Sequence, residues 1–261
     1  MSTLYNDPFF QVPRTVRPTS EGDVEFPILY YKTRCVQAFF LSPVAQVEKH
    51  LAGTGLTPGL VWRDKAVVGL AFFEYTDTSI GVYNEVGLAL PAVPSGAQGR
   101  RWLGLLGDVE SPEHVLGFHI EHLPVTTAAA CAAGREIWGY PKFVTPIPFQ
   151  LSGRDLETGV ADPVTLEVSI CELRGRMGAG LPGPTLSLLL YSSLGAQRLR
   201  TTVNVRGNSR LHRPGSVRLQ LGNSSHPMNA SLRDLGLQGA RPLVLSVTEN
   251  FQSRLNLGRE Y

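Results

Sequence analysis

Strand-forming segments dominate this sequence and constrain its fold more than any other feature. The runs 26–40, 61–77 and 82–93 are rich in β-branched and aromatic residues, and they alternate apolar and polar side chains or are apolar throughout. Further strands are expected at 116–123, 165–173, 185–191, 199–205, 216–221 and 243–250. So many strands would leave open edges unless the sheet closed on itself. We therefore predict an α+β fold with a large, mostly antiparallel β-sheet that closes into a barrel-like core.

A few short helices complete this fold. They are expected at 43–51, 128–138 and 231–237. Ser42 can cap the first helix, and Thr126 or Thr127 can cap the second, whose alanines have the highest helix propensity available. Gly139 then ends the second helix abruptly. The polar, proline-punctuated residues before this fold are expected to form an extended arm or edge segment.

The composition limits what the chain can bind. It has 261 residues, of which 43% are apolar, so it can bury a sizeable core, and we expect a single domain over 1–261. The 24 Lys and Arg nearly balance the 22 Asp and Glu, which argues against the basic surface that nucleic-acid binding requires. The apolar runs are too short to cross a bilayer, and residues 1–10 lack a basic stretch followed by an apolar run. We therefore expect a cytoplasmic protein with a small-molecule partner and no nucleic-acid or membrane partner.

The segment 132–144, AAGREIWGYPKFV, holds the strongest candidate for a reactive side chain. Lys142 directly follows Pro141, which fixes the approach of the chain and places the lysine on a rigid turn. A lysine in a polar loop is usually a solvated surface residue. Here, however, the neighbours are apolar or aromatic, namely Ile137, Trp138, Tyr140, Phe143 and Val144. Such surroundings can desolvate an amine, and a desolvated amine is a nucleophile.

The run GREIWGYPKF at 134–143 resembles the segment that carries the Schiff-base lysine in acetoacetate decarboxylases. The resemblance continues upstream in the runs FEY and YNE, which contain Glu74 and Glu85. It implies that Lys142 forms a Schiff base, that Glu85 and Glu74 are the carboxylates facing it in a pocket, and that the protein is a homo-oligomer. The side chains expected to bind the substrate around these groups are Arg135, Tyr83, Trp138, Tyr140 and Phe143.

Two positions depart from the pattern of that family. Its decarboxylases commonly have a second lysine directly after the first, and here that position is Phe143. An arginine that the family places before its early strand has no counterpart among Asp23, Val24 and Glu25. Both departures bear on the substrate and on decarboxylation itself. Taken alone, a strand glutamate usually faces water, and Arg135 is equally well explained as a cation at a helix C-terminus.

A cluster of histidines raises the question of a metal. His114, His119, Glu121 and His122 lie within a few residues of one another. On a regular strand, His119 and Glu121 share one face and His122 points to the other, so this segment alone cannot supply three ligands. We therefore expect no metal site.

These residues predict a lyase that forms a Schiff base between Lys142 and a small β-keto acid or related carbonyl compound and needs no cofactor. The iminium withdraws electrons from the neighbouring carbon, so a carboxylate one carbon further on can leave as carbon dioxide. Two alternatives remain open. One is a Schiff-base aldolase, dehydratase or cyclase of specialised metabolism, and the other is a non-catalytic ligand-binding member of the family.

Overall fold

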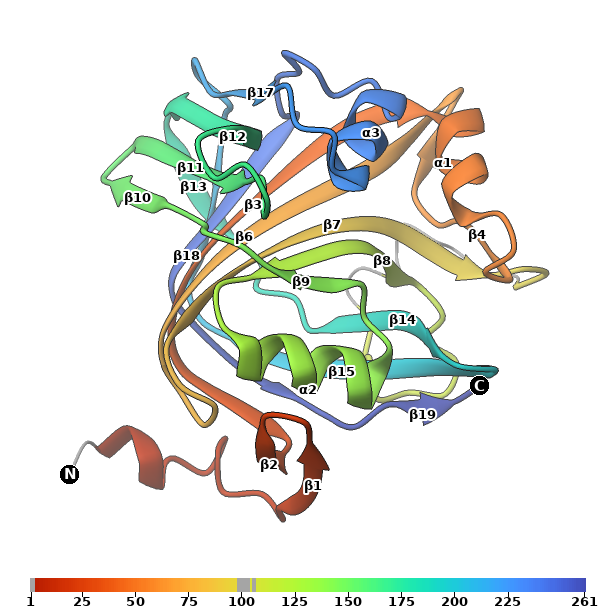
Figure 1. Ribbon diagram of the computed structural model, residues 1–261, viewed down its shortest axis with the longest axis vertical. Coiled ribbons are helices and arrows are strands. Elements are labelled where there is room, and N and C mark those ends of the chain that lie inside the picture. Colours follow the sequence, from red (N-terminus) through yellow and green to blue (C-terminus); the bar gives the residue numbers. More distant parts are fainter. Residues whose placement is uncertain (1–2, 98–103, 105–106) are drawn as a thin grey trace.

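The computed structural model describes residues 3–97, 104 and 107–261. Its centre is a closed barrel of seven strands, and strands account for 52% of the chain (Figure 1). The barrel strands, in order around the barrel, are β18 (Val244–Leu255), β3 (Ile28–Pro43), β6 (Lys65–Thr78), β7 (Tyr83–Pro94), β8 (Gly117–Val125), β14 (Leu188–Leu194) and β15 (Gln197–Arg206). Strand β15 pairs back onto β18 and closes the barrel. Only the β8–β14 pair among these is parallel, so the predicted closed and mostly antiparallel sheet is confirmed.

Helix α2 (Ala128–Trp138) and the short strand β9 (Lys142–Val144) follow β8 in the chain. Strand β9 returns parallel to the end of β8, with Leu123 opposite Lys142, so the helix lies along the opening of the barrel (Figure 1). All seven barrel strands contribute to an inner cluster of apolar side chains, which includes Tyr30, Phe73, Tyr83 and Leu123. The helix adds Ala130, Ala133 and Trp138 to this inner cluster. The helix therefore covers the barrel interior.

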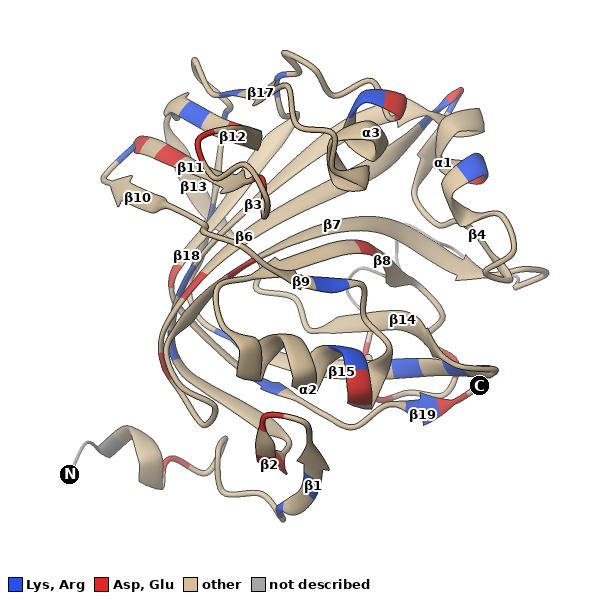
Figure 2. Cartoon of the chain, in the orientation of Figure 1, with Lys and Arg blue, Asp and Glu red and all other residues tan. Residues whose placement is uncertain are grey.

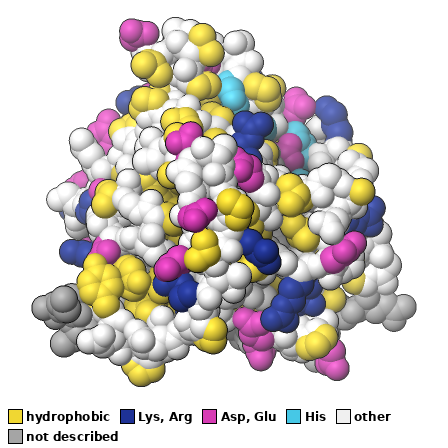
Figure 3. All heavy atoms as spheres, turned by 60° about the horizontal axis from the view of Figure 1, so that its bottom comes forward, with side chains coloured by type: hydrophobic (Ala, Val, Ile, Leu, Met, Phe, Trp, Pro, Cys, Tyr) yellow, Lys and Arg dark blue, Asp and Glu magenta, His cyan; other side chains and the backbone are white. Residues whose placement is uncertain are grey.

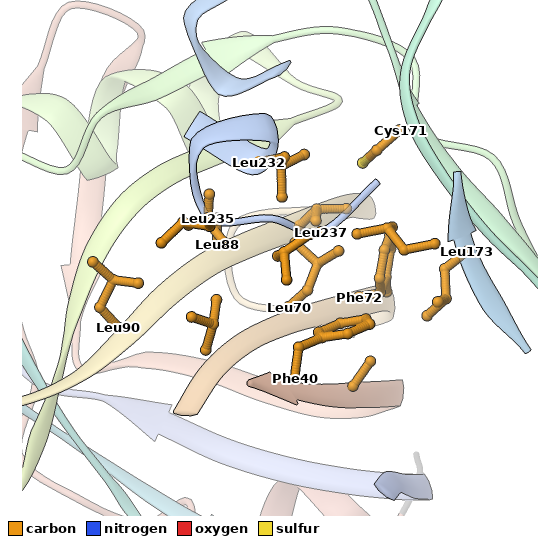
Figure 4. Close-up of a cluster of buried hydrophobic side chains, with 14 of the residues drawn as sticks. Phe40, Leu70, Phe72, Leu88, Leu90, Cys171, Leu173, Leu232, Leu235 and Leu237 are labelled. Atoms are coloured by element: carbon orange, nitrogen blue, oxygen red, sulfur yellow. The ribbon is translucent and has the colours of Figure 1, made fainter. Parts of the chain in front are cut away.

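The opposite face of the long strands is covered by a second layer. A four-stranded sheet consists of β10 (Phe149–Ser152), β11 (Asp155–Ala161), β12 (Ser169–Arg176) and β17 (Arg218–Leu221). With α1 (Val44–Leu51) and α3 (Pro227–Asp234), it buries an outer cluster that includes Phe40, Leu70, Phe72, Leu88 and Leu232 (Figure 4). Strands β10 and β11 were not predicted, although Phe149–Ser152 alternates apolar and polar residues.

The N-terminal arm is more structured than expected. It contains a 3-10 helix (Thr3–Asn6) and a hairpin of β1 (Thr15–Thr19) and β2 (Gly22–Phe26). The hairpin lies below α2 in Figure 1, and its tip is tied to that helix because Ser20 donates hydrogen bonds to the Glu136 carboxylate. The remaining short strands are β4 (Leu56–Pro58), β5 (Val61–Trp62), β13 (Gly180–Gly183), β16 (Ser209–His212) and β19 (Arg259–Glu260).

Two helix starts differ from the prediction. Helix α1 begins after Pro43, which has no side-chain cap to offer, while Ser42 stays in strand β3 with its side chain fully buried. Helix α3 begins four residues earlier than expected, because Pro227 starts it and the His226 side chain accepts a hydrogen bond from the Met228 N–H. The second helix is capped by Thr127 and ends at Gly139, as the sequence predicts.

Charged residues of both signs are interspersed over the molecule. Figure 2 shows Lys and Arg as well as Asp and Glu distributed over many parts of the chain, and the face in Figure 3 carries basic and acidic side chains side by side among apolar ones. None of the helices in the described part of the chain is long and apolar enough to span a membrane.

Candidate active site

The end of α2 sets the position of Lys142. Gly139 adopts a left-handed conformation (φ 67°) that glycine tolerates without strain, and its N–H donates to the backbone oxygen of Arg135. The chain then turns through Pro141 into β9, and the Lys142 side chain runs back beneath the helix. A Cβ atom at Gly134 would lie only 2.3 Å from Cδ of Lys142. The glycine in the helix is therefore what leaves room for the lysine.

All four lysines lie in the described part of the chain, and of these only Lys142 is buried, whereas Lys32, Lys49 and Lys65 are exposed or half-buried. Its Nζ donates a hydrogen bond of 2.6 Å to Oε2 of Glu85, and both side chains are about nine-tenths buried. Glu85 reaches this place because it lies opposite Phe73 in the β6–β7 pair, and cross-strand partners share a face. The lysine ammonium and the carboxylate thus compensate each other inside the barrel.

Tyrosines surround this ion pair. The Tyr75 hydroxyl donates to Oε1 of Glu85 at 3.3 Å, so each carboxylate oxygen has a partner. The hydroxyls of Tyr30 and Tyr83 lie 3.0 Å apart, and Nζ of Lys142 is 5.9 Å from the centre of the Tyr83 ring. Burial, with a further contribution from the negative charge of Glu85, raises the pKa of Tyr30 and Tyr75 well above the ordinary value. These hydroxyls therefore stay protonated and act as hydrogen-bond donors.

The other residues expected to bind the substrate occupy different surroundings. Trp138 is fully buried, packs against Tyr140 and donates from its indole nitrogen to the backbone oxygen of Asn256. Phe143 points to the opposite side of β9 from Lys142, where it packs against the outer cluster and the His226 ring, with ring centres 4.2 Å apart. Arg135 is exposed on the last turn of α2.

A pocket of about 400 Å³ opens beside β9. It is lined by His122, Arg135, Gly139, Tyr140, Pro141, Lys142, Phe143, His226 and Pro227. Four of the predicted site residues, Arg135, Tyr140, Lys142 and Phe143, thus meet in one pocket. Tyr83 and Trp138 lie deeper, in the inner cluster.

Glu74 lies apart from this site, which corrects its expected place beside the lysine. It pairs with Asn84 across β6 and β7 and therefore projects from the opposite face of the sheet to Tyr75 and Glu85. There, Nε of Arg34 donates to Oε2 of Glu74 at 2.5 Å. Neighbouring residues on a strand point to opposite faces of the sheet. Glu74 and Glu85 therefore have different surroundings, although both lie in similar sequence segments.

The histidine segment also differs from the regular strand that the sequence suggested. The β7–β8 register shifts between Leu88 and Ala89, so Glu121 is an extra residue in β8. As a result, Glu121 and His122 both contact Ser231 of α3, and Glu121 also accepts from Nδ1 of His50 at 2.8 Å. Among the described residues, no three His, Cys, Asp or Glu side chains are placed to hold a metal ion.

Three residues of the site were not singled out from the sequence. Tyr30, Tyr75 and Gly134 position or surround the Lys142–Glu85 pair. The strand pattern could have indicated Tyr75, because it lies two residues after Phe73 and one strand face therefore carries both side chains. Tyr30 and the close passage at Gly134 depend on contacts between segments far apart in the chain.

Comparisons with known proteins agree with this architecture. A solved acetoacetate decarboxylase superposes with a TM-score of 0.64 at 15% sequence identity, covering 90% of this chain and 89% of that chain. The acetoacetate decarboxylase from Legionella pneumophila gives 0.65 at 15% identity, covering 100% and 96%. The enduracididine biosynthesis enzyme MppR, in complex with the condensation product of pyruvate and imidazole 4-carboxaldehyde, gives 0.59 at 13% identity, covering 91% and 90%.

At such identities these structures establish the fold alone, and no curated protein sequence matches the chain. The sequence model of a family is more specific. The model for acetoacetate decarboxylase (ADC) matches residues 11–168, which include both strands of the glutamates, α2 and Lys142. Because this match spans more than half of its length, the chain belongs to the acetoacetate decarboxylase family.

Proposed function

We propose that this protein is a lyase that forms a Schiff base between Lys142 and a small β-keto acid. The observation that carries the proposal is the buried amine of Lys142, held 2.6 Å from the Glu85 carboxylate in a tyrosine-lined interior. A lysine buried with one carboxylate partner is rare in proteins, and burial is one of the conditions that make an amine nucleophilic. Membership of the acetoacetate decarboxylase family supports the same reading.

The chemistry follows from the pair. Glu85 is the nearest base and takes a proton from the ammonium, so the neutral amine attacks the keto carbon and water leaves. The iminium draws in the electron pair of the adjacent carbon–carboxylate bond, which breaks to release carbon dioxide and an enamine. A proton then adds to the enamine carbon, and water hydrolyses the imine and frees Lys142.

The pocket beside β9 supplies a route for the substrate. Arg135 is exposed at the pocket wall, where it can attract an anionic keto acid from solution. Phe143 and His226 give the same wall an aromatic surface. The position directly after Lys142, where decarboxylases of the family commonly have a second lysine, is occupied by Phe143. The Phe143 ring faces away from the Lys142 amine.

The absence of that second lysine from the sequence keeps carbon–carbon bond formation as a second candidate. An enamine can attack an aldehyde instead of taking up a proton, and the structural neighbour MppR has been solved with a condensation product of pyruvate and an aldehyde. A Schiff-base aldolase or dehydratase would use the same Lys142 and Glu85. The two candidates differ only in the fate of the enamine.

Reductive trapping tests the proposal. The protein is incubated with acetoacetate or pyruvate, reduced with borohydride, and mapped by peptide mass spectrometry. We expect a covalent adduct on Lys142 and none on Lys32, Lys49 or Lys65, because those three amines are in contact with solvent. Release of carbon dioxide from acetoacetate identifies decarboxylation, and a new product from pyruvate with an aldehyde identifies condensation.

A Lys142→Met variant is the control, since methionine keeps the apolar part of the side chain without an amine. An adduct on a lysine other than Lys142, or none with a panel of keto acids, would contradict the proposal and favour a ligand-binding protein. The family resemblance also implies a homo-oligomer, and light scattering of the purified protein checks that expectation separately.

A further inference from the structure

Two histidines at the pocket beside β9 each use one ring nitrogen in the fold. Nδ1 of His226 accepts a hydrogen bond from the Met228 N–H at the start of α3, at 3.1 Å. Nε2 of His122 lies 3.0 Å from the hydroxyl of Ser231 in the same helix. The second nitrogen of each ring has no hydrogen-bond partner in the described part of the chain, and neither of these two nitrogens is fully buried. The proposed imine chemistry uses neither nitrogen.

The hydrogen bonds decide which nitrogen of each ring carries the proton. The Ser231 hydroxyl has a single proton and donates it to Oε1 of Glu121 at 3.4 Å. It therefore accepts from Nε2–H of His122, which leaves Nδ1 of His122 as an acceptor. Nδ1 of His226 already accepts, so Nε2 of His226 carries the proton and is a donor. Burial lowers the pKa of both rings, that of His122 to about 4, and both are neutral at pH 7.

The free nitrogens of the two rings face a common space. The engaged nitrogen of each ring points toward α3, so the other points away from that helix, on the side of the pocket that both residues line. The ring centres are 6.2 Å apart. Two hydrogen bonds to one oxygen span up to about 6 Å. A single hydroxyl, which donates and accepts at once, can therefore bridge the acceptor of His122 and the donor of His226.

The charges at the pocket indicate what else the ligand carries. Among the described residues that line it, Arg135 and Lys142 are the charged ones, and none is acidic. Lys142 is already compensated by Glu85, whereas Arg135 is exposed and forms no salt bridge in the described part of the chain. A guanidinium binds a carboxylate through parallel N–H···O bonds. The pocket therefore favours a ligand with a carboxylate.

We infer that the pocket beside β9 binds a small hydroxy acid, whose hydroxyl bridges Nδ1 of His122 and Nε2 of His226 and whose carboxylate contacts Arg135. The inference goes beyond the proposed lyase reaction and does not depend on it, because a hydroxy acid has no keto carbon and forms no imine with Lys142. Ser231 is a positioning residue, since it holds the His122 ring in the form that accepts from the hydroxyl.

The protonation of the two rings is measured first, by nitrogen-15 NMR of the wild-type protein at pH 7. We expect a protonated Nε2 and an unprotonated Nδ1 in both His122 and His226. Ser231→Ala removes the oxygen that accepts from His122 and should shift that ring toward a mixture of its two neutral forms, with His226 unchanged. This readout responds to the hydrogen bond itself, and a serine with a merely structural role would not move it.

Calorimetric titration at pH 7 then tests the ligand. Lactate and propionate differ only by a hydroxyl in place of a hydrogen atom, and so do 3-hydroxybutyrate and butyrate. We expect the hydroxy acid to bind the wild-type protein about fivefold more tightly in at least one pair, because each neutral hydrogen bond contributes modestly. Butane-1,3-diol, which lacks the carboxylate, should bind about threefold more weakly than 3-hydroxybutyrate, because the ion pair of an exposed arginine is screened by solvent.

Matched variants separate the hydroxyl from the carboxylate. His122→Gln keeps a donor for Ser231 without the acceptor at Nδ1, and His226→Asn keeps a side-chain cap for α3 without the donor at Nε2. Both should bring the affinity ratio of hydroxy acid to parent acid toward one. Arg135→Gln should weaken the two acids alike and leave their ratio unchanged.

His114→Gln is the control. His114 is also half-buried, but its Nε2 bonds to the backbone oxygen of Leu116 and the residue does not line the pocket. The affinity ratio should keep its wild-type value in this variant. Thermal unfolding of every variant shows that it is folded at the temperature of the titration.

Several results would overturn the inference. One is a wild-type His122 ring that is protonated at Nδ1. Another is equal affinity within both pairs of acids, or no binding of either hydroxy acid. A hydroxyl preference that survives in both histidine variants, or a diol that binds as tightly as the acid, has the same force. Borohydride trapping of Lys142 is read separately, so a failure of the proposed lyase reaction and a failure of this inference are distinguished.

Discussion

The two faces of strands β6 and β7 have different chemistry although the same two strands form both. On the inner face, Glu85 is buried with Lys142 and Tyr75. On the outer face, Glu74 forms an ion pair with Arg34, and both side chains remain partly exposed. The surroundings of a glutamate on these strands therefore depend on the face from which it projects, because Glu85 is enclosed in the barrel whereas Glu74 keeps contact with solvent.

The largest expected effect concerns Glu85. Glu85→Gln removes the base nearest to the amine while keeping the shape of the side chain, and we expect imine formation at Lys142 to slow by about 10²–10⁴-fold. Single-turnover trapping with acetoacetate measures this rate. A loss of less than about threefold would show that another group takes the proton.

A histidine on the outer face of the neighbouring strand β8, His122, is expected to make the stability of the protein depend on pH. Burial is the main reason that the pKa of His122 is lowered to about 4. The unfolded chain therefore binds a proton below about pH 6.5 that the folded protein does not bind until about pH 4, so stability falls as the pH drops through this window. The loss attributable to His122 is up to about 3 kcal/mol.

Urea unfolding between pH 7 and 4 measures this loss, and His122→Gln should make the dependence shallower. His119 and His226, whose pKa values burial also lowers, account for part of the remaining slope. An identical slope in the wild-type protein and the variant would contradict the assignment to His122.

A third prediction tests the space that the inner face leaves for the lysine. In Gly134→Ala, the new Cβ would collide with Cδ and Cε of Lys142 at 2.3 and 2.4 Å, so we expect overpacking to cost about 1–3 kcal/mol and imine formation to slow. Gly87→Ala is the control, because its nearest contact, with Leu123, is an ordinary 3.4 Å. Thermal unfolding and trapping are measured together, and an unaffected trapping rate in Gly134→Ala would show that the lysine can move aside.

The smallest effect is expected for Glu74. Glu74→Gln should lower the free energy of unfolding by about 1 kcal/mol or less, because solvent screens an ion pair in which the Arg34 and Glu74 side chains are 33% and 22% exposed. The trapping rate at Lys142 should stay at the wild-type value. If this variant slowed trapping as much as Glu85→Gln, the difference between the two faces would not account for the chemistry.

The sequence predicted local features well where a few neighbouring residues decide them. Helix α2 has its cap at Thr127 and its end at Gly139, because side-chain capping and the left-handed glycine act within one turn. Ser42 shows the limit of prediction from neighbouring residues. Its hydroxyl could have capped helix α1, but strand β3 continues through Ser42 and the helix begins after Pro43. The single domain over 1–261 and the cytoplasmic location stay predictions.

By itself, the sequence determined that the chain would be mostly strands, that the sheet would need to close, and that a lysine in an aromatic segment was the residue to consider. Only the tertiary structure decided which partners that lysine has. The bulge at Glu121, the face of Glu74 and the tyrosines around Glu85 depend on strand register. A register is set by the packing of all the strands together, and a change of one residue reverses every side chain, so no single segment contains that information.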